Sequence, residues 1–476
     1  MFRPDVMRRF ISVCLALASV GLANRVVQGA RPRYGGTLRV EVEATIRSLD
    51  PAAATSDAAE AAACARAMGL VFEPLVTIDE HGLQPMLATS WESDPRGSRW
   101  QIRLRSGVQL HDGSTLEAWH VASALRVSEP AWMIAVESGA IVISPREPLP
   151  DLPWLLTDVR HAIVVRGSGG ALAGTGPFRI ESREPGRLSL RAHDAYWNGR
   201  PFVDAIRIEM GRSAAAQLSD LEGGRADVVA VSALDARRIT QRGLHVAASR
   251  PLDAIAVVFE PHRSTDTALA WRRTLSAAVN RGSMSAVLLQ RLAEPADALI
   301  PRWLSGYAPL FALDRGTTLS RAAIAALPFD QRELTLRVDA SDPLAHAIAD
   351  RIAVDAREIG FVLKVQAPAG LAPRPDARLV RVRVPNTSPD RALAALIERT
   401  ANRDSGSTQA ALPPAAALDA VYQAESQLLE RAVVVPIVHL PDIYGFSDRV
   451  GTWNRPAVSA SGAWNFADVW LRSGAP

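Results

Sequence analysis

Arginines that alternate with valines are the clearest group in this sequence with the chemistry to bind a ligand. In residues 378–384, valines at every second position would form one face of a strand, which leaves Arg381 and Arg383 together on the opposite face. Guanidinium groups bind carboxylates through paired hydrogen bonds, so two of them side by side predict a site for an anionic ligand. The alternative is a solvated edge strand that is protected by its charges.

Two histidines and a glycine-rich segment are candidates for a catalytic or metal site. His111-Asp112 could act as a base with its orienting carboxylate, and His120 could join His111 at a metal ion; the alternative is a turn before Gly113 with structural histidines. The chain has no Gly-x-Ser-x-Gly and no His-Glu-x-x-His motif, and the glycine-rich segment 167–174 lacks the Lys-Ser/Thr of a phosphate loop. We therefore expect no catalytic site, no metal and no cofactor, with a secreted α/β hydrolase as the alternative.

The N-terminal segment predicts export. Arg3, Arg8 and Arg9 precede an uncharged apolar run that ends in small residues, a pattern typical of a secretory signal peptide over residues 1–23. The arginine pair leaves twin-arginine export open, and Cys14 leaves lipidation open. No later apolar run reaches about 18 residues, so we expect a periplasmic protein that has no membrane span of its own.

Length, charge and cysteine content narrow the class further. The formal net charge is +3, and removal of residues 1–23, with three arginines and one aspartate, leaves about +1, which argues against a nucleic-acid partner. Only Cys64 would remain, so no disulfide can form within the chain. With 476 residues the chain is long enough for two or more domains.

Alternating apolar residues predict half-buried strands at 37–43, 100–105 and 333–338. Asp342 and Gly360 would begin and end a helix between the last of these strands and a further strand at 361–365, which makes a βαβ unit with parallel strands. Helices are also expected at 267–281 and 283–292, and a surface loop at 401–415. The fold class is therefore α/β with mixed sheets.

Four groups of motifs follow one another along the chain. They are Gly35–Leu38 with Ser48–Pro51; Val71–Leu75 with Leu87–Glu92, Leu104–Val108 and Leu110–Gly113; Gly174–Phe178 with residues 195–210; and Trp271–Arg281. In this order, behind a signal peptide, the chain resembles the family 5 extracellular solute-binding proteins, which are the peptide- and nickel-binding receptors of ABC importers. The resemblance covers most of the chain from about residue 33.

This resemblance implies a two-lobe periplasmic-binding-protein-like fold of type II, with hinge crossover strands near 255–259 and 433–438. Lobe I would contain residues 31–254 and 441–476, with a trimmed accessory subdomain around 126–173, and lobe II residues 255–440. The implied function is to bind an oligopeptide or peptide-like solute between the lobes and to deliver it to an ABC permease, as a monomer. The alternative within this class is an orphan sensory or chaperone-like binding protein that does not serve transport.

The resemblance also suggests residues that contact the solute. Thr45, Ile46 and Arg47 precede Ser48–Pro51, where family members approach the ligand, and His439 follows the second crossing. The family usually places an aspartate in the second lobe that holds a ligand ammonium group. Here Asn386 and Asp390 are the candidates in that neighbourhood, and this departure puts recognition of a peptide N-terminus in doubt. Aspartates of the family are also replaced by His120 and Asn280.

Overall fold

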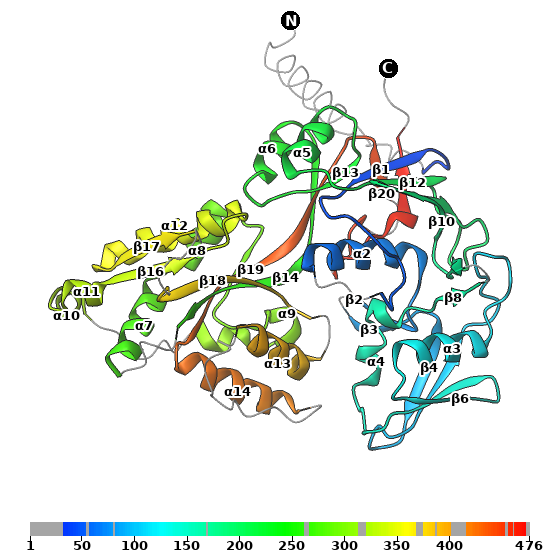
Figure 1. Cartoon of the computed structure of the whole chain (residues 1–476), viewed down its shortest axis with the longest axis horizontal. Coiled ribbons are helices and arrows are strands. Elements are labelled where there is room, and N and C mark those ends of the chain that lie inside the picture. Colours follow the sequence, from blue (N-terminus) through cyan, green and yellow to red (C-terminus); the bar gives the residue numbers. More distant parts are fainter. Residues whose placement is uncertain are drawn as a thin grey trace, which may run out of the picture.

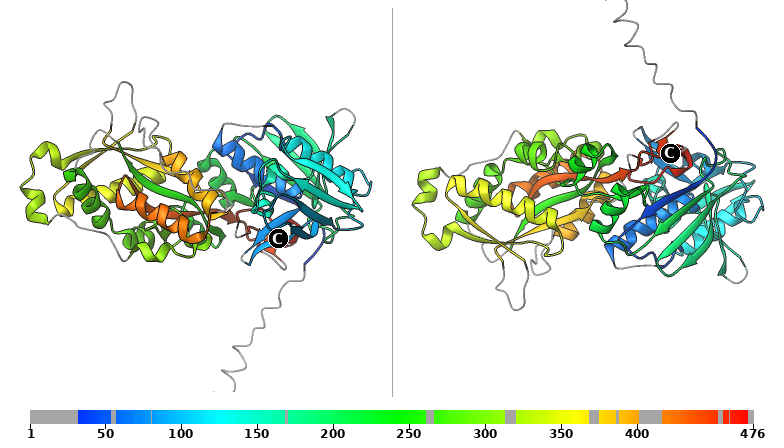
Figure 2. Two further views of the ribbon diagram at one scale, coloured as in Figure 1. Left: turned by 90° about the horizontal axis from the view of Figure 1, so that it is seen from below. Right: turned by 90° about the horizontal axis from the view of Figure 1, so that it is seen from above.

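The computed structural model describes residues 32–472, except for residues 54–56, 80, 168–169, 261–265, 313–319, 368–374, 386–387, 401–415, 453–455 and 460. The predicted signal peptide, the loop expected at 401–415 and the candidate residue Asn386 lie outside the described residues. Figures 1 and 2 show two bodies side by side, joined by the long strands β14 (His245–Phe259) and β19 (Val434–Phe446). These strands run through both places where the sequence predicts crossings, while the predicted lobe boundaries stay a prediction.

One mixed sheet runs through both bodies, because β14 and β19 pair with each other and each pairs with a strand of one body. Its strand order is β10-β11-β12-β1-β13-β19-β14-β18-β16-β17. The strands of the first body are β1 (Thr37–Glu41), β10 (Phe178–Glu184), β11 (Arg187–Ala192), β12 (Ala205–Glu209) and β13 (Val228–Ala230). Those of the second body are β16 (Glu333–Arg337), β17 (Val362–Gln366) and β18 (Ala377–Arg383), and β15 (Glu294–Pro295) pairs with β19 off this path.

The first body also contains an accessory unit around the sheet β4-β5-β7-β6. Its elements are β2 (Val76–Asp79), β3 (Gly82–Pro85), β4 (Ala88–Ser93), β5 (Trp100–Leu104), α3 (Ala118–Ser128), β6 (Met133–Glu137), β7 (Ala140–Ser144), α4 (Leu152–Leu155), η1 (Val159–His161), β8 (Val165–Arg166) and β9 (Leu172–Ala173). The rest of the first body adds α2 (Ala58–Val71), α5 (Ala214–Glu222), α6 (Ala236–Gln241), β20 (Val450–Thr452), η6 (Phe466–Asp468) and β21 (Val469–Leu471).

Helices cover the sheet of the second body. They are α7 (Asp266–Ala278), α8 (Arg281–Ser283), the π-helix η4 (Met284–Leu288), α9 (Arg302–Ser305), η5 (Ala308–Ala312), α10 (Arg321–Ala325), α11 (Phe329–Arg332), α12 (Pro343–Ile359), α13 (Pro389–Thr400) and α14 (Leu418–Glu430). The predicted helix at 283–292 is confirmed only in part: Asn280 caps a short helix that begins at Arg281, and a π-helix continues it from Met284 to Leu288, where the helical structure ends. The π-turn follows a cap that the apolar spacing alone does not reveal.

The predicted βαβ unit is confirmed. The Asp342 carboxylate accepts hydrogen bonds from the N–H groups of Leu344 and Ala345 at 2.9 and 3.0 Å, and α12 ends at Gly360, whose φ is 102°. Strands β16 and β17 pair in parallel on either side of it. This agreement arises because the start and stop signals of α12 are local in the sequence.

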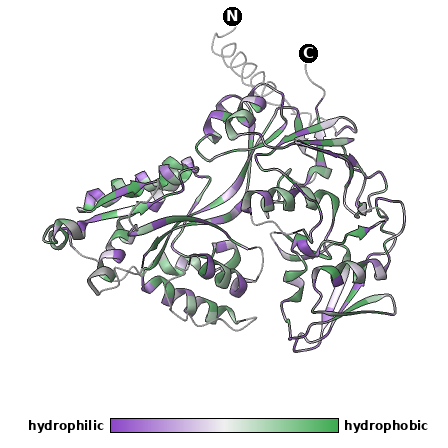
Figure 3. Ribbon diagram, in the orientation of Figure 1, coloured by the Kyte–Doolittle hydropathy of each residue, from purple (hydrophilic) through white to green (hydrophobic). Residues whose placement is uncertain are grey.

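Each body is stabilised by apolar cores of its own. One lies under the first sheet and α2, a second within the accessory unit, and two lie on the opposite faces of the second body's sheet. Along the helices of both bodies, hydrophobic residues alternate with hydrophilic ones (Figure 3), as expected for amphipathic helices that cover a core. The large core of the second body also includes Ala233, with Val231 and Leu234 packed against it, from the segment between β13 and α6 of the first body. Apolar contacts as well as the crossing strands therefore position one body against the other.

The crossing strands are irregular where they leave the first body. The register of β14 and β19 shifts on both sides of the pair Pro251 and Pro441, which face each other. Neither proline has an N–H to donate, so the ladder is interrupted there. Asp442 follows Pro441 directly, and Asp253 lies two residues after Pro251.

Candidate functional site

Five charged side chains gather at this irregular part of the crossing strands. They are Arg66, Asp253, Arg381, Arg383 and Asp442, which we call the crossing cluster. Arg66 is carried by α2 of the first body, and Arg381 and Arg383 by β18 of the second. The two aspartates stand on β14 and β19, so the cluster joins groups from both bodies and from the strands between them.

Pairing of β18 with β14 positions the arginines. The antiparallel register sets Arg383 opposite Asp253, and β16 pairs with β18 only at Ala377 and Arg378. Strand β18 is therefore interior at its start and has an open edge at its end, where Arg381 and Arg383 lie. The predicted common face of these two arginines is confirmed by their shared partner Asp253.

Asp442 links the two bodies. Its carboxylate accepts two hydrogen bonds from Arg383, both at 2.7 Å, and one from Arg66 at 2.8 Å. Asp253 accepts from Arg381 at 2.8 Å and from Arg383 at 3.1 Å. Bidentate pairing of this kind fixes the planes of both groups as well as their distance.

Burial and charge act in opposite directions on the cluster. Burial alone would raise the pKa of Asp442, but the hydrogen bonds from Arg383 and the charge of Arg66 outweigh it and lower the pKa below its usual range. The same carboxylates raise the pKa of Arg383 against the effect of its burial. Arg381 also lies 3.8 Å from Asp342 at the start of α12. With Asp342 counted, three arginines face three aspartates, so the formal charges of the group balance.

The arginines of the cluster are the part of it that a ligand could contact. The aspartates are almost fully buried, whereas the side chains of Arg381 and Arg383 remain 43% and 38% exposed. Exposed guanidinium edges beside neutralised ones favour a carboxylate or phosphate over a cation. The arrangement offers binding, and it contains no nucleophile with a base.

The remaining candidate residues are placed apart from the cluster. Ile46 is buried in the core of the first body, and its N–H lies 3.2 Å from the Sδ of Met210. Thr45 and Arg47 are exposed, and Arg47 forms an ion pair with Glu60 on α2 at 2.5 Å. Contact of these three residues with a solute stays a prediction.

His439 and Asp390 are both buried. Burial lowers the pKa of His439 to about 4, and its Nε2 lies 3.1 Å from the carbonyl oxygen of Leu299 within the second body. Asp390 is in the first turn of α13, where the negative charge of a carboxylate stabilises the N-terminus of a helix. Contact of either residue with a solute stays a prediction.

Both ring nitrogens of His111, the candidate base, are engaged in hydrogen bonds. The N–H of Gly174 donates to Nδ1 of His111 at 3.1 Å, so Nε2 carries the hydrogen and donates to the carbonyl oxygen of Gly176 at 3.0 Å. Burial lowers the pKa of His111 to about 4, which keeps the ring neutral. A Cβ on Gly174 would lie 2.2 Å from the carbonyl oxygen of Val71, so this contact needs glycine. His111 thus joins motifs of the scaffold.

Sequence reasoning missed Arg66, Asp253 and Asp442. The aspartates had a signal, because each is a charged residue within a run of buried, mostly apolar strand residues, and such a charge needs a partner. Arg66 had none, since only the fold brings α2 next to β19, 376 positions further along the chain. The stand-ins for family aspartates act as caps: His120 accepts from the N–H of Glu117, and Asn280 from that of Ser283.

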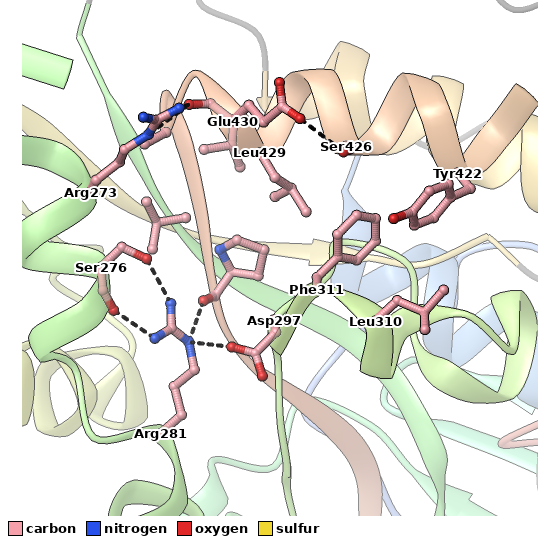
Figure 4. A pocket seen from close by; sticks show the side chains of 14 residues that line it. Arg273, Ser276, Arg281, Asp297, Leu310, Phe311, Tyr422, Ser426, Leu429 and Glu430 are labelled. Carbon is pink, nitrogen blue, oxygen red and sulfur yellow. Dashed lines mark hydrogen bonds and ion pairs between the residues drawn. The ribbon is translucent and has the colours of Figure 1, made fainter. Parts of the chain in front are cut away.

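A pocket of about 350 Å³ lies elsewhere, inside the second body. Figure 4 shows Arg273 and Arg281 on one side of it and Phe311 and Tyr422 on the other. Its arginines already donate to carbonyl oxygens, Arg273 to Glu430 and Arg281 to Ala296 and Pro436. All its lining residues come from the second body, so a solute there would not touch both bodies.

Within the described part of the chain, no three His, Cys, Asp or Glu side chains are arranged to hold a metal ion. Among the helices of the described residues, none is both long and apolar enough to cross a membrane.

Comparison with known proteins gives matches to one family. The family model described as bacterial extracellular solute-binding proteins, family 5 Middle, matches residues 82–378, more than half of the chain. YhjP, an uncharacterized protein of Bacillus subtilis, is 30% identical over 159 residues, 30% of this chain and 28% of that protein. The chain spans less than half the length of the curated relatives that it matches first.

Two solved structures with the same fold hold different ligands. NikA from Brucella suis, in complex with Fe(III)-EDTA, matches with a TM-score of 0.70 at 18% identity, over 92% of this chain and all of that chain. The oligopeptide-binding protein AppA from Bacillus subtilis, in complex with a nonapeptide, matches with a TM-score of 0.63 at 14% identity, over 93% of this chain and all of that chain. At these identities the likeness concerns the fold alone.

Proposed function

Because this chain belongs to the bacterial extracellular solute-binding proteins of family 5, we propose that it binds an oligopeptide or peptide-like solute between its two bodies and delivers it to an ABC permease. Members of this family bind peptides or small solutes and work with ABC permeases. The predicted fold class, a two-lobe type II binding-protein fold, is confirmed by the matching structures. The nonapeptide complex of AppA supports a peptide as the cargo here, as does the name of the related SapA of Salmonella typhimurium, a peptide transport periplasmic protein.

The crossing cluster is the observation that carries this proposal. It places partly exposed guanidinium groups beside the strands that join the bodies. A peptide has a carboxylate at its C-terminus, and Arg381 and Arg383 would bind that group through N–H donors at their exposed edges. Asp253 and Asp442 would hold the guanidinium planes in place.

Native purification tests the cargo. The protein would be purified without added ligand and then denatured, and released molecules would be identified by mass spectrometry; titration with di- to pentapeptides would follow. We expect a peptide, and a roughly tenfold or greater loss of affinity for Arg381→Gln, because a hydrogen bond to a charged group contributes about 1.5–3 kcal/mol.

Arg378→Gln is the matched control, since Arg378 lies on the same strand and pairs with Glu260 at 2.8 Å. A bound metal chelate or sugar would refute the proposal that the cargo is a peptide, but it would support a solute-binding function. Equal affinities of the Arg381 and Arg378 variants would refute the site.

Export, oligomeric state and transport belong to the same proposal. We expect the chain in the periplasm as a monomer, which cell fractionation and light scattering would show. Loss of peptide uptake in cells that lack this chain would support delivery to a permease. Unchanged uptake, together with retained binding, would instead favour the sensory alternative.

A further inference from the structure

A second polar contact joins the bodies at a distance from the crossing strands. Asp151 accepts hydrogen bonds from Ser388 at 3.2 Å and from both Nε and Nη2 of Arg391, the latter at 3.2 Å. Asp151 belongs to the accessory unit of the first body, and Ser388 and Arg391 stand at the start of α13 in the second, 237 and 240 positions later.

Both sides of this contact are held rigidly. Asp151 lies between Pro150 and Leu152, which begins α4 and is buried in the core of the accessory unit. The turn at Gly97 supports this segment: the Leu149 N–H donates to the Gly97 carbonyl oxygen at 3.0 Å, and a Cβ on Gly97 would lie 2.7 Å from Pro150. On the other side, Leu393 and Leu396 fix α13 in a core of the second body.

The contact is buried enough to matter. Asp151 and Ser388 are each 6% exposed, and the Arg391 side chain is 33% exposed. A buried carboxylate that loses its cation is left with an uncompensated charge, so separation of the bodies at this point would require water to replace both partners. An exposed ion pair would not carry this cost.

We propose that Asp151, Ser388 and Arg391 form a latch between the two bodies, and that this latch determines how long the solute is retained. The inference rests on the proposed function for what is retained, but not for the latch itself. Ser388, which lies in the sequence between the candidate residues Asn386 and Asp390, binds a carboxylate of the protein's own first body. A solute enclosed between the latch and the crossing cluster would leave only after the latch opens.

Small-angle X-ray scattering of the ligand-free mature chain tests the latch without knowledge of the solute. We expect Asp151→Asn and Arg391→Gln each to raise the radius of gyration, and the exchanged pair Asp151→Arg with Arg391→Asp to restore the wild-type value. Glu398→Gln, at an exposed position on the same helix, should change nothing. Circular dichroism would confirm that each variant is folded.

Unchanged scattering in both single variants would overturn the latch even if peptides bind. The role in retention has its own measurement, the dissociation rate of the peptide identified from native purification. A roughly tenfold faster dissociation in Arg391→Gln is expected, because breaking a buried charge pair acts mainly on the off-rate. If the radius of gyration rises in the variants but no peptide binds, the latch is supported and the proposed cargo is refuted. If the radius of gyration rises and the dissociation rate of the peptide is unchanged, the role of the latch in retention is refuted.

Discussion

At the scale of single residues, Glu73 shows what the family motifs do. Its buried carboxylate accepts hydrogen bonds from Thr175 at 2.8 Å, Tyr196 at 2.7 Å and Trp197 at 2.9 Å. Burial raises the pKa of Glu73, and these three donors oppose the rise. Residues from three separate motifs therefore meet at one side chain, which explains why they occur together in the sequence.

Removal of one of these donors should be measurable. Tyr196→Phe leaves a buried carboxylate with one bond fewer, and we expect the free energy of unfolding to fall by about 1–3 kcal/mol. Urea denaturation followed by tryptophan fluorescence would measure it. Tyr34→Phe, at a side chain that is 64% exposed, is the control and should cost less than about 0.5 kcal/mol. Equal losses in the two variants would contradict the role assigned to Glu73.

His439 predicts a dependence of stability on pH. Its folded pKa of about 4 lies below the unfolded value of about 6.5, so protons bind more readily to the unfolded chain. The stability that neutral His439 contributes is present above about pH 6.5 and is lost as the pH falls towards 4. In His439→Gln the loss of stability between pH 7 and 4.5 should be smaller by about 2 kcal/mol. His81→Gln, at a side chain that is 74% exposed, is the control, and a His439 variant with the same pH dependence of stability as the wild type would refute the assignment.

At the scale of elements, the helix α12 offers a test of capping, because the contact of Asp342 with Arg381, 3.8 Å away, is lost in both of the variants compared. Asp342→Ala removes the acceptor for two N–H groups at the start of the helix, and we expect a loss of about 1 kcal/mol in the free energy of unfolding. Asp342→Ser retains a capping oxygen and should recover most of it. Equal stabilities of the alanine and serine variants in urea denaturation would show that the cap contributes little.

The same element shows what sequence reasoning can reach. The β16-α12-β17 unit was predictable because its strands alternate and its helix carries its own start and stop signals within about 35 residues. The π-helical turn after Asn280 was not, since a one-residue change of helical register leaves the apolar pattern almost intact. Arg381 and Arg383 could be predicted as neighbours from strand periodicity. Their pairing with Asp442, and that of Arg66 with Asp442, depends on the topology of the whole sheet, which no local pattern contains.

At the scale of the whole molecule, the crossing cluster should contribute to stability as well as to binding. Asp442→Asn removes the carboxylate that Arg66 and Arg383 share, and we expect a loss of about 2 kcal/mol or more, limited by the exposure of Arg383. Asp194→Asn breaks an exposed pair with Arg200 and should cost less than about 0.5 kcal/mol. Denaturation that is indistinguishable for the two variants would show that Asp442 does not link the bodies energetically.

The facing prolines of the crossing strands have a mechanical consequence. Two paired strands bend most easily where the hydrogen bonds between them are missing. Here Pro251 faces Pro441, and neither supplies a backbone donor. Any rotation of one body against the other would therefore bend β14 and β19 mainly at this pair of prolines. Asp253 and Asp442 orient Arg381 and Arg383, which we propose to bind the cargo, so bending of the strands would turn those arginines at the same time. Rotation of the bodies and reorientation of the arginines would thus both depend on the few residues of β14 and β19 around Pro251 and Pro441.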